Sequence, residues 1–158
     1  MNNSPIVSIL MPTYNHEKYI SQAIESVLAQ ETSYRYELLI HDDKSTDTTL
    51  KIAQEYAKKY PDKIFLLTEK ENQGLLKSYK KLIGYSKGKY LAILESDDYW
   101  IDKNKLQMQI DFLENNYDYG IVAGDIRNID ENGNTITPPL HKHAYTEYKS
   151  MVRKTSRK

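Results

Sequence analysis

Short apolar runs that fit buried strands alternate along this chain with longer segments whose apolar residues recur at helical spacing. The runs are rich in β-branched and aromatic residues and end at prolines, charged clusters or turn-forming residues. The five runs cover residues 6–11, 36–41, 63–68, 89–94 and 119–126. Strands that alternate with helices form a mostly parallel sheet with helices on both faces, so the pattern predicts an α/β fold.

The four helical segments cover residues 16–30, 47–60, 74–88 and 104–116. Local signals predict where several elements begin or end. Asn15 is placed to cap the first helix, Pro61 to end the second, and Gly88 to cap the carboxyl end of the third. Pro12 is expected to close the first strand.

The chain is long enough for one domain with a buried core, and its charge is balanced. It has 158 residues, with 22 Lys and Arg against 22 Asp and Glu, which argues against a nucleic-acid partner. No cysteine is present, so disulfides and thiolate metal sites are excluded. We find no leader pattern and no apolar run near the length of about 20 residues that spans a bilayer, and we expect a cytoplasmic location without a transmembrane segment.

The charge balance changes toward the C-terminus. After Pro138 and Pro139 the chain carries six Lys and Arg but one acid, Glu147, and little apolar periodicity. We therefore predict one domain over residues 1–137 and a basic, poorly patterned tail over residues 138–158. Such a tail suits peripheral contact with an anionic membrane surface, such as the inner face of a membrane, and a solvated tail is the alternative.

Three carboxylates, those of Glu95, Asp97 and Asp98, stand directly behind the fourth apolar run. Like charges at this spacing raise one another's pKa unless a cation lies among them. Mg²⁺ and Mn²⁺ bind carboxylate oxygens and share their remaining coordination with substrate phosphates. These residues therefore favour a divalent metal site, and the alternative is a solvated loop with an Asp that caps the next helix.

Polar residues also follow the first two strands, and sheets of this kind bind ligands at the carboxyl ends of their strands. Asp42 and Asp43 come directly after the second strand, where a carboxylate can accept hydrogen bonds from a nucleoside. Asp47 or Ser45 can cap the following helix. Tyr14, after the first strand, can stack on a base or lie half-buried in a turn. The glycine patterns of dinucleotide-binding and P-loop proteins are absent.

The polar motifs after the first, second and fourth strands, taken in chain order, make the chain resemble the family 2 glycosyltransferases of the GT-A fold. The segments that carry the resemblance are VSILMPTYNHEKYISQAIESVLAQ, ELLIHDDKSTDTT and NQGLLKSYKKLIGYSKGKYLAILESDDYW, and the similarity extends from about Val7 to Gly133. The resemblance implies an inverting enzyme that moves a sugar from a nucleotide diphosphate donor to an acceptor hydroxyl. It also implies Mn²⁺ or Mg²⁺ as the cofactor and a glycan or lipid-linked acceptor.

The resemblance assigns roles to individual residues. Pro12 and Tyr14 match positions that line the nucleobase pocket, and Asp43 matches the acid that contacts the base. Asp97 and Asp98 match the last two acids of the family's metal and nucleotide motif. Asp97 is expected to face the ribose or the sugar, and Asp98 to ligate the metal that bridges the diphosphate.

The chain departs from the family pattern in two places and in its length. Glu95 stands where many members carry Asp, which keeps a carboxylate there. Lys77, Lys80 and Lys81 lie where members often have an Arg or Asn; one of them meets phosphate, or all three are solvated. The family's catalytic domain continues well beyond residue 158, and its later part supplies the acceptor site and the catalytic base.

We identify no catalytic base in this chain for that reason. We expect a truncated GT-A domain that is the donor-binding half of an enzyme of polysaccharide biosynthesis. The truncated side of the sheet is expected to leave an apolar face that favours self-association into homo-oligomers. The alternative is a non-catalytic nucleotide-binding or interaction module that keeps the sheet without turnover.

Overall fold

The computed structural model describes residues 4–130 and 133–136. The chain divides into two compact units, Met1–Gln107 and Met108–Lys158, and each is described by itself. The first unit holds a four-stranded parallel sheet with helices between the strands, which confirms the α/β prediction. Its elements are β1 (Val7–Thr13), α1 (Ile20–Leu28), β2 (Tyr36–Asp42), α2 (Thr49–Lys59), β3 (Ile64–Thr68), α3 (Leu75–Tyr85) and β4 (Tyr90–Ile93).

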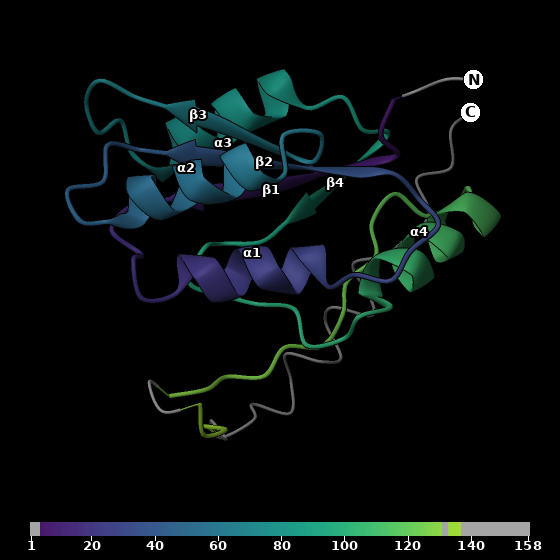
Figure 1. Cartoon of the computed structure of the whole chain (residues 1–158). Helices are drawn as coiled ribbons and strands as arrows, with labels where there is room; N and C mark the ends of the chain where they lie inside the picture. The colour runs from purple at the N-terminus through teal and green to yellow at the C-terminus, as the bar shows by residue number, and fades with distance from the viewer. Residues whose placement is uncertain (1–3, 131–132, 137–158) are drawn as a thin grey trace. The chain divides into compact units, whose positions relative to one another are not determined.

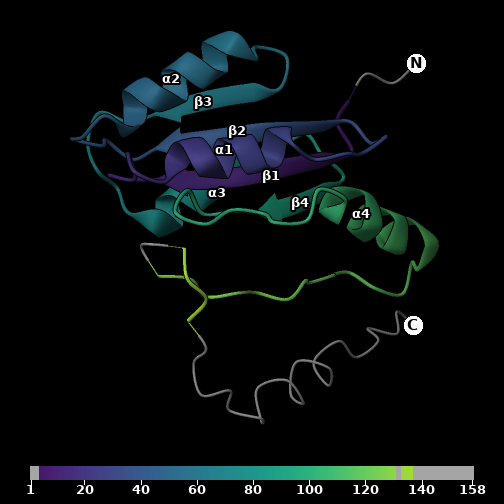
Figure 2. The same cartoon turned by 60° about the horizontal axis from the view of Figure 1, so that its bottom comes forward.

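The strand order is β3-β2-β1-β4, so β1 lies inside the sheet and β4 forms one edge (Figure 2). From β1 the chain steps outward to β2 and β3, and it then returns across the sheet to pair β4 with the other side of β1. Because crossovers are right-handed, the helices that connect strands in one direction across the sheet lie on one face, and a helix that connects strands in the other direction lies on the opposite face. Accordingly α1 and α2 contact each other on one face, and α3 packs against β1 and β2 on the other (Figure 1).

The core lies where these helices meet the two inner strands. All seven residues of β1 are buried, as are six of the seven in β2. From α1, Ile20, Ala23, Ile24 and Val27 are buried at the spacing of one helix face. Full burial of an aliphatic side chain contributes about 1.5–3 kcal/mol, so these positions hold the sheet and α1 together.

Pro12 does not close the first strand, because β1 continues through it to Thr13. The carbonyl of Leu10 accepts the N–H of Leu94, and the carbonyl of Thr13 accepts the N–H of Asp43. Residues alternate sides along a strand, so Pro12 faces the side of β4, where pairing has already ended. The missing N–H of proline therefore costs this strand no ladder hydrogen bond.

Two predicted helix caps are also wrong. Tyr19, not Asn15, occupies the N-cap position of α1, and Asn15 has φ 56° in the left-handed region. Ser86, not Gly88, is the C-cap of α3. Gly88 is required for a different reason: a Cβ there would lie 2.4 Å from the backbone nitrogen of Ser8. The glycine lets the chain pass directly over β1.

The second unit contains no fifth strand among its described residues. The segment 119–126, predicted as a strand, is irregular, and Ile121 and Ile126 are exposed. A strand needs a neighbour to satisfy its N–H and C=O groups, and within the described part of the chain the sheet ends at β4. Gly133 has φ +80° beside the antiparallel bridge of Ile129 and Thr135.

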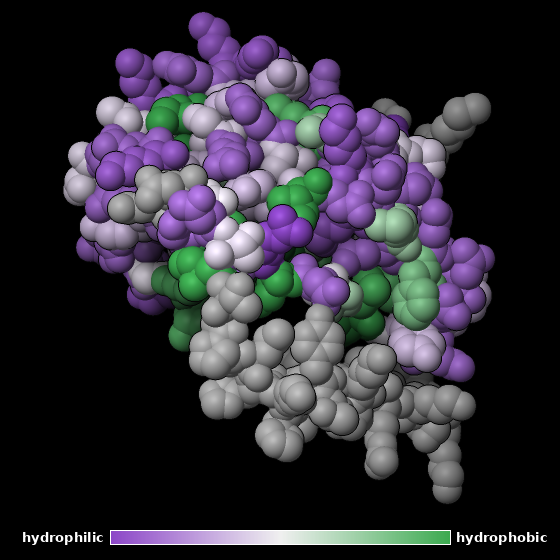
Figure 3. Space-filling view, turned by 90° about the horizontal axis from the view of Figure 1, so that it is seen from below, coloured by the Kyte–Doolittle hydropathy of each residue, from purple (hydrophilic) through white to green (hydrophobic). Residues whose placement is uncertain are grey.

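The remaining helix, α4 (Lys105–Asn115), matches the fourth helical segment. The basic tail predicted over residues 138–158 lies outside the described residues. Among those that are described, no helix is both long and apolar enough to span a membrane. Apolar side chains do reach the surface in several places (Figure 3), and Leu91 and Ile93 of β4 are among the exposed ones.

Candidate functional site

The loops that follow β1, β2 and β4 meet at the carboxyl edge of the sheet, as predicted. The chain leaves β1 toward α1 on one face, and the connection into β4 comes from α3 on the other, so β1 and β4 flank the point where the topology reverses. Sheets of this kind bind ligands outside such a point. Residues 12–16, 42–47 and 94–99 therefore form the candidate site.

The β1–α1 and β2–α2 loops are joined by hydrogen bonds between side chain and backbone. The N–H of Asn15 donates to Ser45 Oγ at 3.0 Å, and Asn15 Oδ1 accepts the N–H of Thr46 at 2.8 Å. Glu17 Oε2 accepts the N–H of Thr48, the N-cap residue of α2, at 3.0 Å. The two loops therefore form one body, and the left-handed Asn15 is needed for this linkage instead of for capping α1.

His16 connects the same body to the loop after β4. Its N–H donates to Thr49 Oγ1 at 2.8 Å, which fixes the backbone. Its Nδ1 lies 2.7 Å from Ser96 Oγ and 4.0 Å from Asp97 Oδ1. Ser96 is fully buried, so the ring is held beside Asp97. The sequence assigned no role to His16, because no spacing along the chain reveals a partner 80 residues away.

Asp97 and Asp98 lie on the surface of the loop after β4, with Glu95 beside them. Partial burial, followed by the charges of Asp97 and Glu95, raises the pKa of Asp98 above its ordinary value. Tyr79 of α3 donates its hydroxyl to Glu95 Oε1 at 3.1 Å, and burial together with the three nearby carboxylates raises the pKa of Tyr79 to about 12. The carboxylates thus form a cluster whose mutual repulsion a cation relieves.

The donor set of this cluster suits one class of metal. No group of three or more His, Asp or Glu side chains within residues 4–130 and 133–136 is arranged to hold an ion by itself. Zinc sites require three or four protein ligands, whereas Mg²⁺ and Mn²⁺ are held by one or two carboxylates together with substrate phosphates. Asp97 and Asp98 therefore fit a hard cation that shares its coordination with a bound diphosphate.

Asp43 has a structural task that the sequence did not reveal. Its Oδ1 accepts the N–H of Gln73 at 2.8 Å, and its Oδ2 accepts the N–H of Gly74 at 2.7 Å. Gly74 is the N-cap residue of α3, so the buried carboxylate ties the end of β2 to the start of α3. Each carboxylate oxygen keeps a second lone pair for a nucleobase N–H.

The other predicted nucleotide-binding residues lie at the end of β1. Pro12 is buried in the strand opposite His41, and Tyr14 is 43% exposed in the loop that follows. Between them, Thr13 Oγ1 is buried without a hydrogen-bond partner, and so is Oδ1 of Asp42, the residue opposite it in β2. Buried polar atoms usually have partners, so this pair marks a place where a bound polar group is favoured.

One of the three lysines singled out in α3 has a defined partner. Lys81 makes a close ion pair with Glu69, and His41 Nε2 lies 3.3 Å from the same carboxylate. Hydrogen bonds from Lys81 and then from His41 lower the pKa of Glu69. Lys81 is therefore committed to this cluster behind β2 and β3, which leaves Lys77 and Lys80 as the exposed lysines of α3.

The fold is that of the GT-A class, and sequence comparison places the chain in one family of that class. The model of glycosyl transferase family 2 matches residues 8–157. The chain therefore belongs to glycosyl transferase family 2. The match extends through most of the segment that was predicted to be a separate tail.

Individual relatives agree with this assignment. The chain is 42% identical over 115 residues to WfgD of Escherichia coli, a UDP-Glc:alpha-D-GlcNAc-diphosphoundecaprenol beta-1,3-glucosyltransferase. The aligned residues cover 72% of this chain and 44% of WfgD. Among solved structures, residues 1–349 of S. aureus TarS in complex with UDP are 27% identical, with a TM-score of 0.63 over 75% of this chain and 38% of that chain. The mannosyltransferase PcManGT of Pyrobaculum calidifontis, solved with GDP-Man and Mn²⁺, shares the fold at 24% identity and a TM-score of 0.63, over 71% of this chain and 33% of that one.

The chain spans only part of these proteins. Relatives that are 35–42% identical to it are covered over 39–47% of their own length. The ligands and the activity of the whole relatives are therefore not established for this chain.

Proposed function

We propose that this chain is the donor-binding part of an inverting, metal-dependent glycosyltransferase. Its ligand is a sugar nucleotide diphosphate, and its metal is Mn²⁺ or Mg²⁺. The observation that carries the proposal is the cluster of Glu95, Asp97 and Asp98, which has a raised Asp98 pKa and lies beside the reversal point of the sheet.

The residues divide the donor between them. Tyr14 and Pro12 border the base at the end of β1, and Asp43 accepts a base N–H while it holds the start of α3. Asp97 faces the ribose or sugar, and its Oδ1 lies 4.0 Å from Nδ1 of His16. UDP in TarS and GDP-Man in PcManGT support a nucleotide of this kind.

Asp98 is the residue that would hold the metal, with Asp97 beside it. The cation supplies charge neutralisation for the leaving diphosphate, as a Lewis acid does in phosphate chemistry. Glu95, which accepts a hydrogen bond from Tyr79, adds negative potential around this position.

Calorimetric titration tests this proposal directly. We expect UDP or GDP to bind in the presence of Mn²⁺ and binding to weaken about tenfold or more in Asp98→Asn, because contacts to charged groups contribute about 1.5–3 kcal/mol. Asp62→Asn is the matched control, since Asp62 is an exposed acid at the opposite edge of the sheet. Equal affinities for all three proteins, or binding that ignores the metal, would refute the assignment.

We assign the acceptor site and the catalytic base to the part of the relatives that this chain does not span. For this chain the alternative remains a nucleotide-binding module without turnover. Release of UDP from a labelled donor, with water as the acceptor, distinguishes the two: slow, metal-dependent hydrolysis that is lost in Asp98→Asn favours an enzyme part, and tight binding without any release favours the module.

A further inference from the structure

The charge of the first unit is separated between the two edges of its sheet. The four loops at the carboxyl ends of the strands, residues 14–19, 43–48, 69–74 and 94–99, carry eight acids and three lysines. The loops at the amino ends and the last turn of α2 carry six exposed bases: Arg35, Lys58, Lys59, Lys63, Lys87 and Lys89. A chain with no net charge therefore has one acidic edge and one basic edge, and the second is called the amino-edge surface below.

The loops at the amino ends of the strands hold few acids. Glu31 pairs with Lys103 at 3.6 Å, and Glu37 is buried, where it accepts hydrogen bonds from Ser8 Oγ and the N–H of Lys87. Asp62 is the exposed acid that remains among the amino-end loops. None of the ion pairs found in the described residues engages Lys59, Lys63 or Lys87.

The lysines of this surface lie over aromatic rings. Lys59 lies 5.3 Å from the ring centroid of Tyr60, Lys63 5.0 Å from Tyr36, Lys87 5.7 Å from Phe65 and Lys89 5.0 Å from Tyr90. Each pair presents an ammonium group next to an apolar ring. Lys and Tyr of this kind are suited to the boundary between water and lipid, where the charged head meets phosphate and the ring meets the acyl region.

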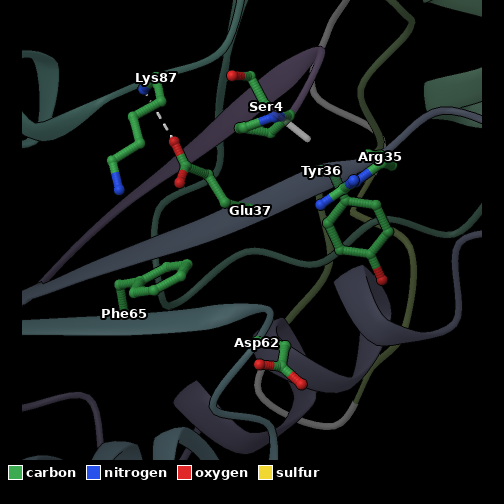
Figure 4. Close-up of a pocket in the computed structure, with 8 residues that line it drawn as sticks. Ser4, Arg35, Tyr36, Glu37, Asp62, Phe65 and Lys87 are labelled. Carbon is green, nitrogen blue, oxygen red and sulfur yellow. Dashed lines mark hydrogen bonds between the residues drawn. The ribbon is translucent and has the colours of Figure 1, made fainter. Parts of the chain in front are cut away.

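A shallow hollow opens within the same surface (Figure 4). Arg35 and Tyr36 line it on one side and Lys87 and Phe65 on the other, with Asp62 at a third. The hollow lies at the amino ends of β1, β2 and β3, away from the carboxylates of the donor site. Its lining also includes the carboxylate of Glu37, which accepts the N–H of Lys87, so the hollow adds relief to the surface but no net positive charge.

From these observations we infer that the amino-edge surface docks the domain on an anionic phospholipid membrane. A single-stranded nucleic acid is a poorer partner, because base stacking needs open ring faces and lysines already cover four of these rings. The acidic edge is repelled by the same membrane, so the charge separation also orients the domain. The donor site then opens away from the lipid surface.

Vesicle cosedimentation of the full 158-residue chain tests this inference. Each basic residue near an anionic surface strengthens partitioning about fivefold, which corresponds to roughly 1 kcal/mol. The triple variant Lys59→Gln, Lys63→Gln, Lys87→Gln should therefore bind vesicles of 70% phosphatidylcholine and 30% phosphatidylglycerol about a hundredfold more weakly. The matched variant Lys18→Gln, Lys51→Gln, Lys70→Gln removes the same charge from exposed positions near the acidic edge and should bind as the parent does.

The outcomes separate the explanations. Equal losses in the two variants would overturn the inference, because binding would then depend on net charge or on the basic C-terminal segment. Binding of soluble polyphosphate but not of vesicles, with the same loss in the first variant, would replace the membrane by a soluble anionic polymer. No binding by the parent at 50 mM salt would overturn the inference altogether.

Orientation gives a readout that does not depend on affinity. The chain has no cysteine, so Asp62→Cys and Glu71→Cys each introduce a single labelling site, at the amino and the carboxyl edge respectively. An environment-sensitive fluorophore should shift to the blue on vesicles only at position 62. A shift at position 71 alone would show that the domain docks through the wrong edge.

Discussion

Replacing Gly88 by alanine tests how closely the chain crosses β1. A Cβ at this position would lie 2.4 Å from the backbone nitrogen of Ser8, 2.7 Å from the carbonyl carbon of Val7 and 2.9 Å from Ser8 Oγ. Two of these atoms are backbone in a buried central strand and have no rotamer to move to. The segment that leads into β4 must therefore shift away from β1.

The shift also breaks hydrogen bonds that serve a buried carboxylate. The N–H groups of Lys87 and Gly88 donate to Ser8 Oγ at 3.1 and 2.8 Å, and the N–H of Lys87 donates to Glu37 Oε1 at 2.9 Å. Overpacking costs about 1–3 kcal/mol, and an unsatisfied buried group costs about 1–3 kcal/mol more. We expect Gly88→Ala to lower the free energy of unfolding by roughly 2–6 kcal/mol.

Urea and thermal unfolding measure this loss. At about 2–4 °C for each kcal/mol in a domain of this size, the melting temperature should fall by roughly 4–24 °C. Gly84→Ala is the control, because nothing lies within 4 Å of its Cβ and it belongs to α3. Alanine there should be neutral or stabilise by up to about 1 kcal/mol. Unfolding of Gly88→Ala within 0.5 kcal/mol of the parent would show that β4 does not approach β1 as described.

Three further predictions concern charge and turnover. Without metal, Asp98→Asn should raise the melting temperature at neutral pH, because the raised pKa of Asp98 means that its ionised form destabilises the fold. This gain in melting temperature should vanish below the ordinary pKa of 3.8, and a gain that persists in acid would contradict this cause. Glu69→Gln should lower the melting temperature at neutral pH, because the lowered pKa of Glu69 gives stability that is present above pH 4.5 and lost as the pH falls through the folded-state pKa. Stability curves of variant and parent that never converge in acid would exclude this cause. Finally, the chain should not transfer sugar through multiple turnovers, since a missing general base alone costs about 10²–10⁴-fold, and a glycoside product formed at an enzymatic rate in a labelled-donor assay would reveal a base within these residues.

Periodicity predicted the four strands of the sheet and the helices between them, because burial on both faces leaves a continuous apolar run in each of β1 and β2. It failed at residues 119–126, where an apolar run has no neighbouring strand within the described residues. Pattern alone cannot distinguish such a run from a paired strand. The ends of elements were also uncertain: Pro12 is tolerated inside β1 only because β4 stops early, and no local signal carries that information.

The candidate site shows the same division. Asp97 and Asp98 could be singled out from paired charges behind an apolar run, and both lie on the surface. The hydrogen-bond partners of Asp43 and His16 could not be predicted from the sequence, because Gln73 lies 30 residues from Asp43 and Ser96 lies 80 residues from His16. Only the arrangement of the sheet brings these residues together. The opposite charges of the two edges were hidden for a related reason, since the sums along the chain cancel.

The polar contacts of Glu37 have a consequence for how the protein is made. Its carboxylate receives the N–H of Lys87, which lies 50 residues later in the chain. A ribosome adding 5–20 residues per second needs roughly 3–10 s to synthesise that stretch. During this interval β1 and β2 can pair, but the carboxylate between them still needs water at the end where β4 will cross. We therefore expect nascent chains shorter than about residue 88 to remain hydrated and sensitive to protease, and the core to close only when the glycine that crosses β1 has left the ribosome.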